Sequence, residues 1–278
     1  MTGSVTALPP AARARSRVRA YLRLLRVGPM IDLAYRFNAL TNVAFLVMRI
    51  YLYYALWSAI YHPGQVVAGM DVRQAITYSV LAALQSWAPA PTADTIQSRV
   101  NDGSIVFLFM RPFPVLRYFF VQRLGSAFYA LAWLVVGGTI AWIAGIIMPP
   151  ASATLLGVYL ISVVLGQVVR YYLQVLFDLS AFWTIRTTGL AMLYGFMISL
   201  LGGSMVPIWF FPGWLQHVAL WLPFQAFANT PLSLYVGRLP FSGALGDLSL
   251  QVFWCLVLAG LARLIFLAAE RRVVIQGG

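Results

Sequence analysis

A run of 46 residues, 124–169, contains no aspartate, glutamate, lysine or arginine, and no other feature of the sequence constrains the fold as strongly. A helix crosses a bilayer in about 20 residues, so this run is long enough for two crossings. Met148-Pro149-Pro150 divides it where the chain has to turn, because proline cannot continue a helix. The run therefore predicts a hairpin of two membrane-spanning helices joined by a tight external turn.

The composition extends this prediction to the whole chain. The sequence is 61% hydrophobic, with a mean hydropathy of +0.82 and only 9% charged residues, whereas soluble domains carry about 25% charge. These values predict an all-α membrane protein with one transmembrane domain over 1–278. The net charge of +12 comes from arginine alone, and most arginines flank apolar stretches, which suits anionic lipid headgroups better than nucleic acid. The single cysteine, Cys255, excludes an internal disulfide and a cysteine-cluster metal site.

The other apolar stretches bring the expected number of transmembrane helices to six. The segment 208–246 is apolar but contains four prolines, so we interpret it as re-entrant short helices with aromatic anchors at the membrane interface. A seventh span across 214–236 is the alternative for this segment. The six expected spans are 38–61, 72–90, the two halves of 124–169, 188–207 and 248–268.

The N-terminal region and the arginines set the expected orientation. Residues 1–12 are expected to be a disordered tail, and residues 14–28 form a basic amphipathic pattern typical of a helix lying flat on the cytoplasmic face. With six spans and both termini in the cytoplasm, sixteen arginines fall inside and only Arg73 and Arg238 fall outside. This bias follows the positive-inside rule.

A second basic stretch, residues 97–123, carries four arginines between long uncharged runs. The turn Asn101-Asp102-Gly103 and the prolines at 112 and 114 cut it into short pieces, so it cannot be one spanning helix. A basic, kinked segment between spans belongs at the cytoplasmic surface, where it can contact headgroups or a partner.

Several catalytic classes are disfavoured because their residues are missing. A P-loop needs a lysine and the chain has none, so it cannot carry that ATPase site itself. The two histidines, His62 and His217, are both expected outside, and no carboxylate lies near the centre of an expected span. This argues against an ion-coupled carrier and against a membrane hydrolase, which need such groups within the membrane. We expect no catalytic residue and no metal site.

A few residues within the expected spans are candidates for a translocation path, and each has a structural alternative. Arg49 either contacts an anionic substrate group or is a structural arginine satisfied by carbonyls and hydroxyls. In the second span, a mildly polar face either lines a path or holds helices together by hydrogen bonds. In the fifth span, soft side chains and small residues suit either varied lipophilic ligands or close helix packing. The candidates in these two spans are Gln74, Thr77, Tyr78, Gln85, Met192, Phe196 and Ser199.

The order of several short motifs resembles a known family. Val100, Asp102-Gly103, Phe107-Leu108 and Arg111-Pro112 form one series. Phe-Phe-Pro-x-Trp-Leu from position 210, Leu-Pro-Phe from 222, Pro231 and Tyr-Val-Gly from 235 form a second. Together with the size and the expected spans, they resemble type-2 ATP-binding-cassette (ABC) exporter permeases, in particular bacterial six-span permeases encoded separately from their ATPase.

The resemblance implies a role for each segment. Residues 14–28 would be the interfacial helix, 97–112 the coupling helix that docks on an ATPase subunit, and 208–246 the external re-entrant helices that gate the exit. The residues implied for coupling are Arg99, Asn101, Asp102, Gly103, Arg111 and Pro112, and those implied for the external gate are Phe211, Pro212, Trp214, Pro223 and Phe224.

The resemblance also implies the assembly and its function. Two permease chains, identical or homologous, would combine with two copies of a separate ATPase subunit that binds ATP and magnesium, in a bacterial cytoplasmic membrane. The chain itself would be a cofactor-free, non-catalytic permease that exports a lipophilic or amphipathic substrate such as a natural product, drug, lipid or lipopeptide. The alternatives are a membrane-embedded lipid-modifying enzyme and an ion-coupled carrier.

Overall fold

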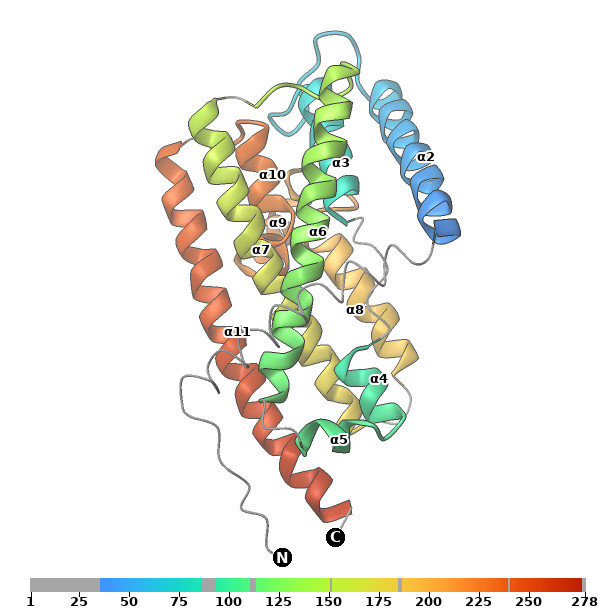
Figure 1. Ribbon diagram of the computed structural model, residues 1–278. Helices are drawn as coiled ribbons and strands as arrows, with labels where there is room; N and C mark the ends of the chain where they lie inside the picture. The colour runs from blue at the N-terminus through green and yellow to red at the C-terminus, as the bar shows by residue number, and fades with distance from the viewer. Residues whose placement is uncertain are drawn as a thin grey trace, which may run out of the picture.

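The computed structural model describes residues 36–86, 94–110, 114–150, 152–184, 187–239 and 241–276. Within these ranges the regular secondary structure is helical, apart from one isolated bridge between Val67 and Met70 (Figure 1). The tail 1–12, the helix expected at 14–28, and Arg111 and Pro112 lie outside the described residues.

The elements are α2 (Arg36–Ile60), α3 (Val72–Ser86), α4 (Ile96–Asn101), α5 (Ile105–Phe109), α6 (Val115–Ile143), α7 (Ala153–Leu179), α8 (Thr188–Leu200), α9 (Gly213–Trp221), α10 (Asn229–Tyr235) and α11 (Phe241–Gln276), with the short 3₁₀ helices η1 (Ser180–Phe182), η2 (Ile208–Phe210) and η3 (Pro223–Ala226).

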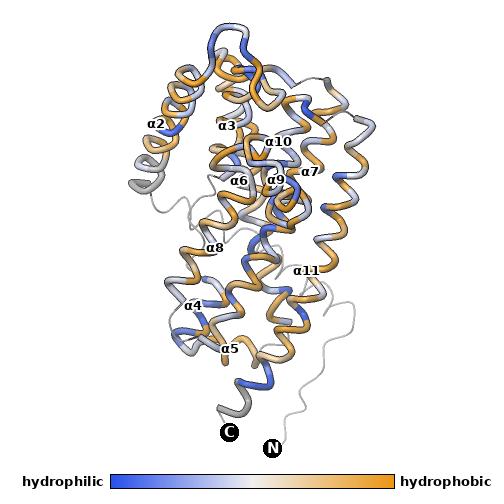
Figure 2. Tube along the Cα trace, turned by 180° about the vertical axis from the view of Figure 1, so that it is seen from behind, coloured by the Kyte–Doolittle hydropathy of each residue, from blue (hydrophilic) through white to orange (hydrophobic). Residues whose placement is uncertain are grey.

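Four helices in the described part of the chain are long and apolar enough to cross a membrane: α2, α6, α7 and α11. The hairpin predicted from the uncharged run is confirmed as α6 and α7, joined by a loop that contains Met148 and Pro149. Figure 2 shows mostly hydrophobic residues along these helices and hydrophilic stretches at the α4–α5 end and in the loop between α2 and α3. The last expected span, 248–268, is longer than predicted, because α11 covers 241–276.

Two of the six expected spans are short helices in the structure. α3 has 15 residues and reaches Ser86. Residues 87–93 lie outside the described part of the chain, and the expected end of this span at residue 90 is among them. α8 has 13 residues and ends at Leu200, not at 207 as predicted. Gly203 explains this end, since its φ of +76° is a left-handed conformation that stops the helix.

The segment 208–246 forms separate short helices, so the alternative of a seventh span across 214–236 is wrong. α9 stops at Trp221 because Pro223 has no N–H to continue its hydrogen bonds and instead begins η3. The short helices lie beside α7, in the part of the bundle away from α4 and α5 (Figure 1). Their expected re-entry into the membrane stays a prediction.

Three arginines assigned to connecting segments lie in long helices instead. α6 begins at Val115, so Arg117 and Arg123 belong to it, and α7 continues to Leu179 with Arg170 inside it. The prediction was wrong here because it ended each span at the first charged residue beyond the uncharged run. A helix longer than the hydrocarbon core can carry arginines near its end, where their long side chains reach the interface.

α7 is the central helix of the bundle, packing on α6, α8, α10 and α11, while α3 is almost completely buried between α2, α6 and α10. Gly166 of α7 allows a close approach to η3, since a Cβ there would lie 2.5 Å from the Ala226 carbonyl oxygen. α2 contacts mainly α3 and stands at the side of the bundle (Figure 1). Most of its side chains are therefore exposed in the single chain.

Candidate functional site

The predicted coupling segment forms two short helices, α4 and α5, at the end of the bundle where α7 and α11 also end (Figure 1). The break between them falls at 102–104, beside the turn that the sequence indicated. These two helices and the residues that hold them are the candidate coupling site.

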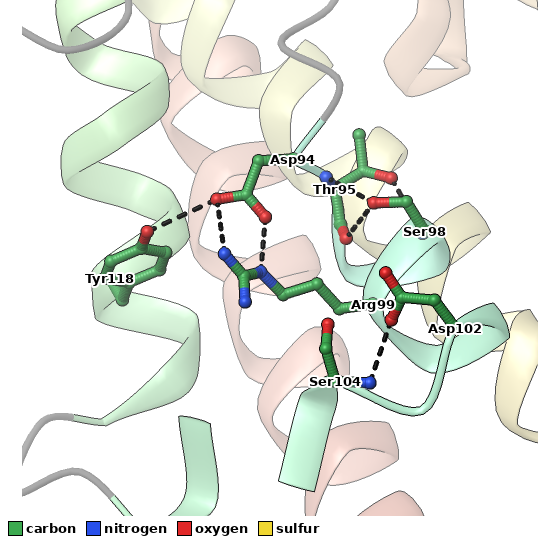
Figure 3. A network of polar contacts seen from close by, with 7 residues as sticks. All are labelled: Asp94, Thr95, Ser98, Arg99, Asp102, Ser104 and Tyr118. Atoms are coloured by element: carbon green, nitrogen blue, oxygen red, sulfur yellow. Dashed lines mark hydrogen bonds and ion pairs between the residues drawn. The ribbon is translucent and has the colours of Figure 1, made fainter. Parts of the chain in front are cut away.

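α4 begins at a well-formed cap. The Thr95 side chain accepts a hydrogen bond from the Ser98 backbone N–H at 3.1 Å, and the Ser98 hydroxyl accepts one from the Thr95 N–H at 3.0 Å (Figure 3). This reciprocal capping box satisfies two backbone donors that a helix start otherwise leaves unpaired. A six-residue helix is too short to be stable alone, so this cap and the tertiary contacts of α4 fix its position.

An ion pair ties the start of α4 to α6. Arg99 Nε and Nη2 donate to the two carboxylate oxygens of Asp94, the second bond measuring 2.9 Å. Tyr118 of α6 donates its hydroxyl to Asp94 Oδ2 at 3.3 Å (Figure 3). The hydrogen bond with Asp94 raises the pKa of Arg99 above its ordinary value, and burial opposes the rise. Such a bidentate pair fixes the orientation of both side chains.

The tip between α4 and α5 is exposed and carries a charge. Gly103 has a φ of +75°, which favours glycine, and open space surrounds it where a Cβ would lie. Asp102 Oδ1 accepts a hydrogen bond from the Ser104 N–H at 2.8 Å. Hydrogen bonds from the Ser104 side chain and backbone hold the pKa of Asp102 below its ordinary value, so its carboxylate is charged at neutral pH.

Three helices, α6, α7 and α8, hold α4 in place. Ile96 is fully buried in a cluster with Phe119 of α6 and Leu179 of α7. Gln97 donates its side-chain N–H to the Thr187 hydroxyl, at the start of α8. A displacement of α4 therefore acts directly on α6, α7 and α8.

α5 has one buried side and one exposed apolar side. Ile105 and Leu108 are buried in the same cluster as Ile96. Phe107 and Met110, just past the helix end, are 66% and 79% exposed, and Val106 is exposed beside them. Large exposed apolar side chains next to a charged tip are typical of a protein interface. Asn101, Asp102 and Gly103 are also exposed, so six residues at this tip are open to a partner.

The polar candidates of α3 make hydrogen bonds to other elements. Gln74 Nε2 donates to the Val236 carbonyl at 3.1 Å, and the Thr77 hydroxyl accepts from the Met148 N–H at 3.0 Å. Tyr78 donates its hydroxyl to Asn229 Oδ1 at 3.2 Å, and Gln85 donates to the Phe227 carbonyl. These contacts favour the alternative in which this face of α3 holds helices together.

Arg49 also has partners within the chain. Its Nη2 donates to the Tyr53 hydroxyl at 3.1 Å, and its guanidinium lies 5.5 Å from the centre of the Tyr53 ring. The Tyr53 hydroxyl donates onward to the Ser204 carbonyl at 3.4 Å. The contacts agree with the structural alternative for Arg49, in which hydroxyls and carbonyls satisfy the charge.

The candidates on α8 and in the external segment are dispersed. Met192 and Phe196 are exposed on α8, and Ser199 is half-buried. Phe211 and Phe224 share one small apolar cluster with Ile208, whereas Pro212 and Trp214 are exposed at the start of α9. Pro223 is buried at the start of η3. Their roles in a path and a gate stay predictions.

A polar stripe on α7, which is not among the residues singled out from the sequence, faces the N-terminal half of α6. Gln167, Arg170, Gln174 and Asp178 recur at intervals of three or four residues, which places them on one face of a helix. Gln122, Arg123 and Ser126 of α6 line the same small cavities. The helical spacing is visible in the sequence, but the stripe begins at the end of the uncharged run 124–169, where the predicted fourth span also ends.

Comparison with known proteins gives one finding. The family described as "ABC-2 family transporter protein" matches residues 46–277. Neither the search of curated proteins nor the search of solved structures gives a match.

Proposed function

Because the chain belongs to the ABC-2 family of transporter membrane proteins, whose permeases generally pair with ABC ATPase subunits, we propose that it is the permease subunit of an ATP-driven exporter. Permeases of this family are typically non-catalytic, and the chain is a multi-pass membrane protein. ATP and magnesium would bind in a separate ATPase subunit, present in two copies. Two permease chains, identical or homologous, would form the translocation path.

The arrangement of α4 and α5 is the observation that carries this proposal. α4 is clamped to α6 through Asp94 and Tyr118 and contacts α8 through Thr187. The adjoining tip exposes Asp102, Phe107 and Met110. A segment that is rigidly joined to several spans and presents apolar side chains to the outside is suited to receive a push from a docked subunit.

The proposed mechanism follows from these contacts. ATP binding would bring the two ATPase subunits together and displace the α4–α5 unit. The displacement would reach α6 through the Asp94–Tyr118 hydrogen bond, α7 through Ile96 and α8 through Gln97. α7 packs on α10 and η3, so its motion would be transmitted to the short helices of 208–246.

We further propose six spans, with α3 and α8 completing the set, and cytoplasmic termini in a bacterial inner membrane. The described arginines support this orientation: Arg99, Arg117, Arg123, Arg170, Arg263 and Arg271 lie towards the α4–α5 end, whereas Arg73 and Arg238 lie in the opposite half. The substrate would be lipophilic or amphipathic, because the spans carry few polar residues.

The test is purification of the tagged chain from its native membrane in mild detergent, followed by mass spectrometry of the intact complex. We expect two ATPase subunits with two permease-sized chains, and a double variant Phe107→Asp/Met110→Asp that no longer retains the ATPase. Trp214→Asp is the matched control, because Trp214 is 72% exposed on α9 and far from α5. Wild-type protein that carries no ATPase, or a double variant that retains it as well as the control does, would contradict the proposal.

A further inference from the structure

Two arginines, Arg123 of α6 and Arg170 of α7, line one small cavity, and no carboxylate among the described residues is hydrogen-bonded to either. Arg123 and Arg170 are close enough for their positive charges to repel. Among the described residues the nearby acids are engaged elsewhere: Asp178 accepts a hydrogen bond from Gln174 at 2.8 Å, and Asp94 pairs with Arg99. Asp178 attracts Arg123 only through space. The Arg170 guanidinium lies 4.5 Å from the centre of the Phe227 ring.

The pair lines a small cavity with an unsatisfied hydroxyl. Ser126, Gln167 and Tyr171 complete its wall, and its volume is about 30 Å³. The Ser126 Oγ atom is buried and has no hydrogen-bond partner, and the same holds for Gln122 Oε1 beside it. A cavity of this size has room for a few oxygen atoms. Two guanidiniums and a hydroxyl provide donors for an anion.

An apolar groove of about 70 Å³ adjoins this cavity and shares Arg123, Ala127, Gln167 and Tyr171 with it. Its other residues are apolar and come from both helices: Phe120, Leu124, Phe128, Leu131, Val163, Val164 and Val168. Phe128 and Val164 are 61% and 48% exposed, so the groove opens at the side of the bundle where bilayer lipid would lie.

The two arginines lie at the same depth. Arg123 is eight residues after the start of α6 and Arg170 nine residues before the end of α7, each about 12–14 Å along the helix. α6 has 29 residues, about 43 Å, and the hydrocarbon core spans about 30 Å. With α6 centred on the core, both residues lie just inside its cytoplasmic boundary, a depth from which an arginine side chain reaches headgroup phosphates.

We propose that this site binds a membrane lipid with an anionic phosphate headgroup. The phosphate would lie between Arg123 and Arg170, where it would relieve their repulsion, and one acyl chain would lie in the groove between Leu124 and Val164. Arginine recognises phosphate through two parallel N–H donors, which a single surface charge does not offer. Lipid binding needs no transport and stands on this geometry alone; that the bound lipid is also the exported cargo rests on the proposed function.

The test uses the purified full-length chain in a neutral detergent, titrated with a fluorescent phosphatidylglycerol and, separately, with the matching phosphatidylcholine. We expect saturable binding of phosphatidylglycerol only, and at least about tenfold weaker binding by Arg123→Gln/Arg170→Gln. Arg117→Gln is the matched control, since Arg117 is exposed two turns earlier on α6 and does not line the cavity; its affinity should stay within about twofold.

A second variant tests the acyl chain independently of the charges. Val164→Trp, at a residue that lines the groove but not the arginine cavity, fills the groove and should weaken lipid binding, while inorganic phosphate should compete weakly and equally in both proteins. Equal affinity for the two lipids, or an equal loss in Arg117→Gln, would overturn the site. Complete displacement of the lipid by inorganic phosphate would instead identify a free-anion site. If a variant loses lipid binding together with a change in the oligomeric state of the protein, the groove is a contact surface for a second copy of the chain, and the proposal is overturned.

These outcomes are distinguishable from a failure of the proposed function. The binding assay contains no ATPase and no ATP, so a chain that never retains an ATPase can still bind the lipid. A chain that forms the complete complex can equally fail to bind it.

Discussion

Two groups of buried polar side chains in the bundle differ in whether their polar atoms have hydrogen-bond partners. In the half that contains α3 and α10, Tyr78 bonds Asn229, Trp57 donates to Ser79 at 2.8 Å, and Gln251 donates to the Ala226 carbonyl at 2.8 Å. In the half that contains α4, the α6–α7 cavity leaves Ser126 Oγ and Gln122 Oε1 unpaired.

The difference separates polar groups that hold the fold from polar groups that are available to a ligand. A buried hydrogen bond contributes modestly to the free energy of unfolding. Removing one of its two groups leaves the other unsatisfied, at a cost of about 1–3 kcal/mol. A buried group that is already unpaired imposes that cost on the native state. Substitution should therefore destabilise the protein where the buried polar groups are hydrogen-bonded and leave its stability nearly unchanged where they are unpaired, which is testable position by position.

The largest effect should come from the close approach of α7 to the backbone of η3 at Gly166. Gly166→Val would place a Cβ 2.5 Å from the Ala226 carbonyl oxygen, and backbone atoms cannot move aside cheaply. We expect a loss of about 3 kcal/mol or more in unfolding free energy, seen as a lower thermal midpoint in detergent or as loss of folded protein. Gly157→Val on the same helix meets open space and should be nearly neutral. Equal effects at the two glycines would show that α7 and η3 are not packed as described.

Gln251 should give the next largest effect. Its side chain accepts a hydrogen bond from the Ser162 hydroxyl at 3.0 Å and donates to the Ser162 and Ala226 carbonyls at 3.1 and 2.8 Å. Gln251→Leu would leave these buried partners unsatisfied, and we expect a loss of about 2–3 kcal/mol in the free energy of unfolding. Ser249→Ala removes one exposed hydrogen bond on the same helix and is the control. A neutral Gln251→Leu would mean that this polar contact does not hold the half together.

How far the sequence predicted each half depends on the range of the interactions involved. The α6–α7 hairpin, the broken coupling segment and the proline-divided 208–246 region all follow from local rules for charge, glycine and proline, and the structure contains them as helices and breaks. The predicted ends of the spans that contain α7 and α8 were wrong. The depth at which Arg170 can lie depends on helix packing, and the end of α8 depends on the positive φ of Gly203, and neither is visible in the sequence.

The site residues show the same limit. The face of α3 with Gln74 and Tyr78 could be read as a stripe, but its partners lie in α10 and the turn that follows, more than 150 positions away. Asp94 was not among the candidates for coupling, because its role arises only when the chain brings Arg99 and Tyr118 to it. Helical spacing alone would have found the stripe of Gln167, Arg170, Gln174 and Asp178.

The ion pair at α4 should have an intermediate and local effect. Arg99→Gln removes a bidentate pair that is partly exposed, so we expect about 1 kcal/mol, confined to the α4 region. Hydrogen exchange should accelerate at residues 94–101 and remain unchanged in α3 and α10. Arg117→Gln, which removes an exposed arginine of the same end, should leave exchange in α4 as in the wild type. Unchanged exchange in Arg99→Gln would leave the capping box and Ile96 as the contacts that fix α4.

The smallest effect should come from the α6–α7 arginines, and its sign is the sharpest test of the comparison. In lipid-free detergent, Arg123→Gln should change the unfolding free energy by less than about 0.5 kcal/mol or raise it, because it removes the charge repulsion with Arg170. Phosphatidylglycerol should then raise the thermal midpoint of the wild type but not of the variant, since a ligand stabilises only the state that binds it. A variant destabilised as strongly as Gln251→Leu would show that Arg123 is a structural group. The α6–α7 cavity would then be part of the packing that holds the fold, and Ser126 would be an ordinary packing residue.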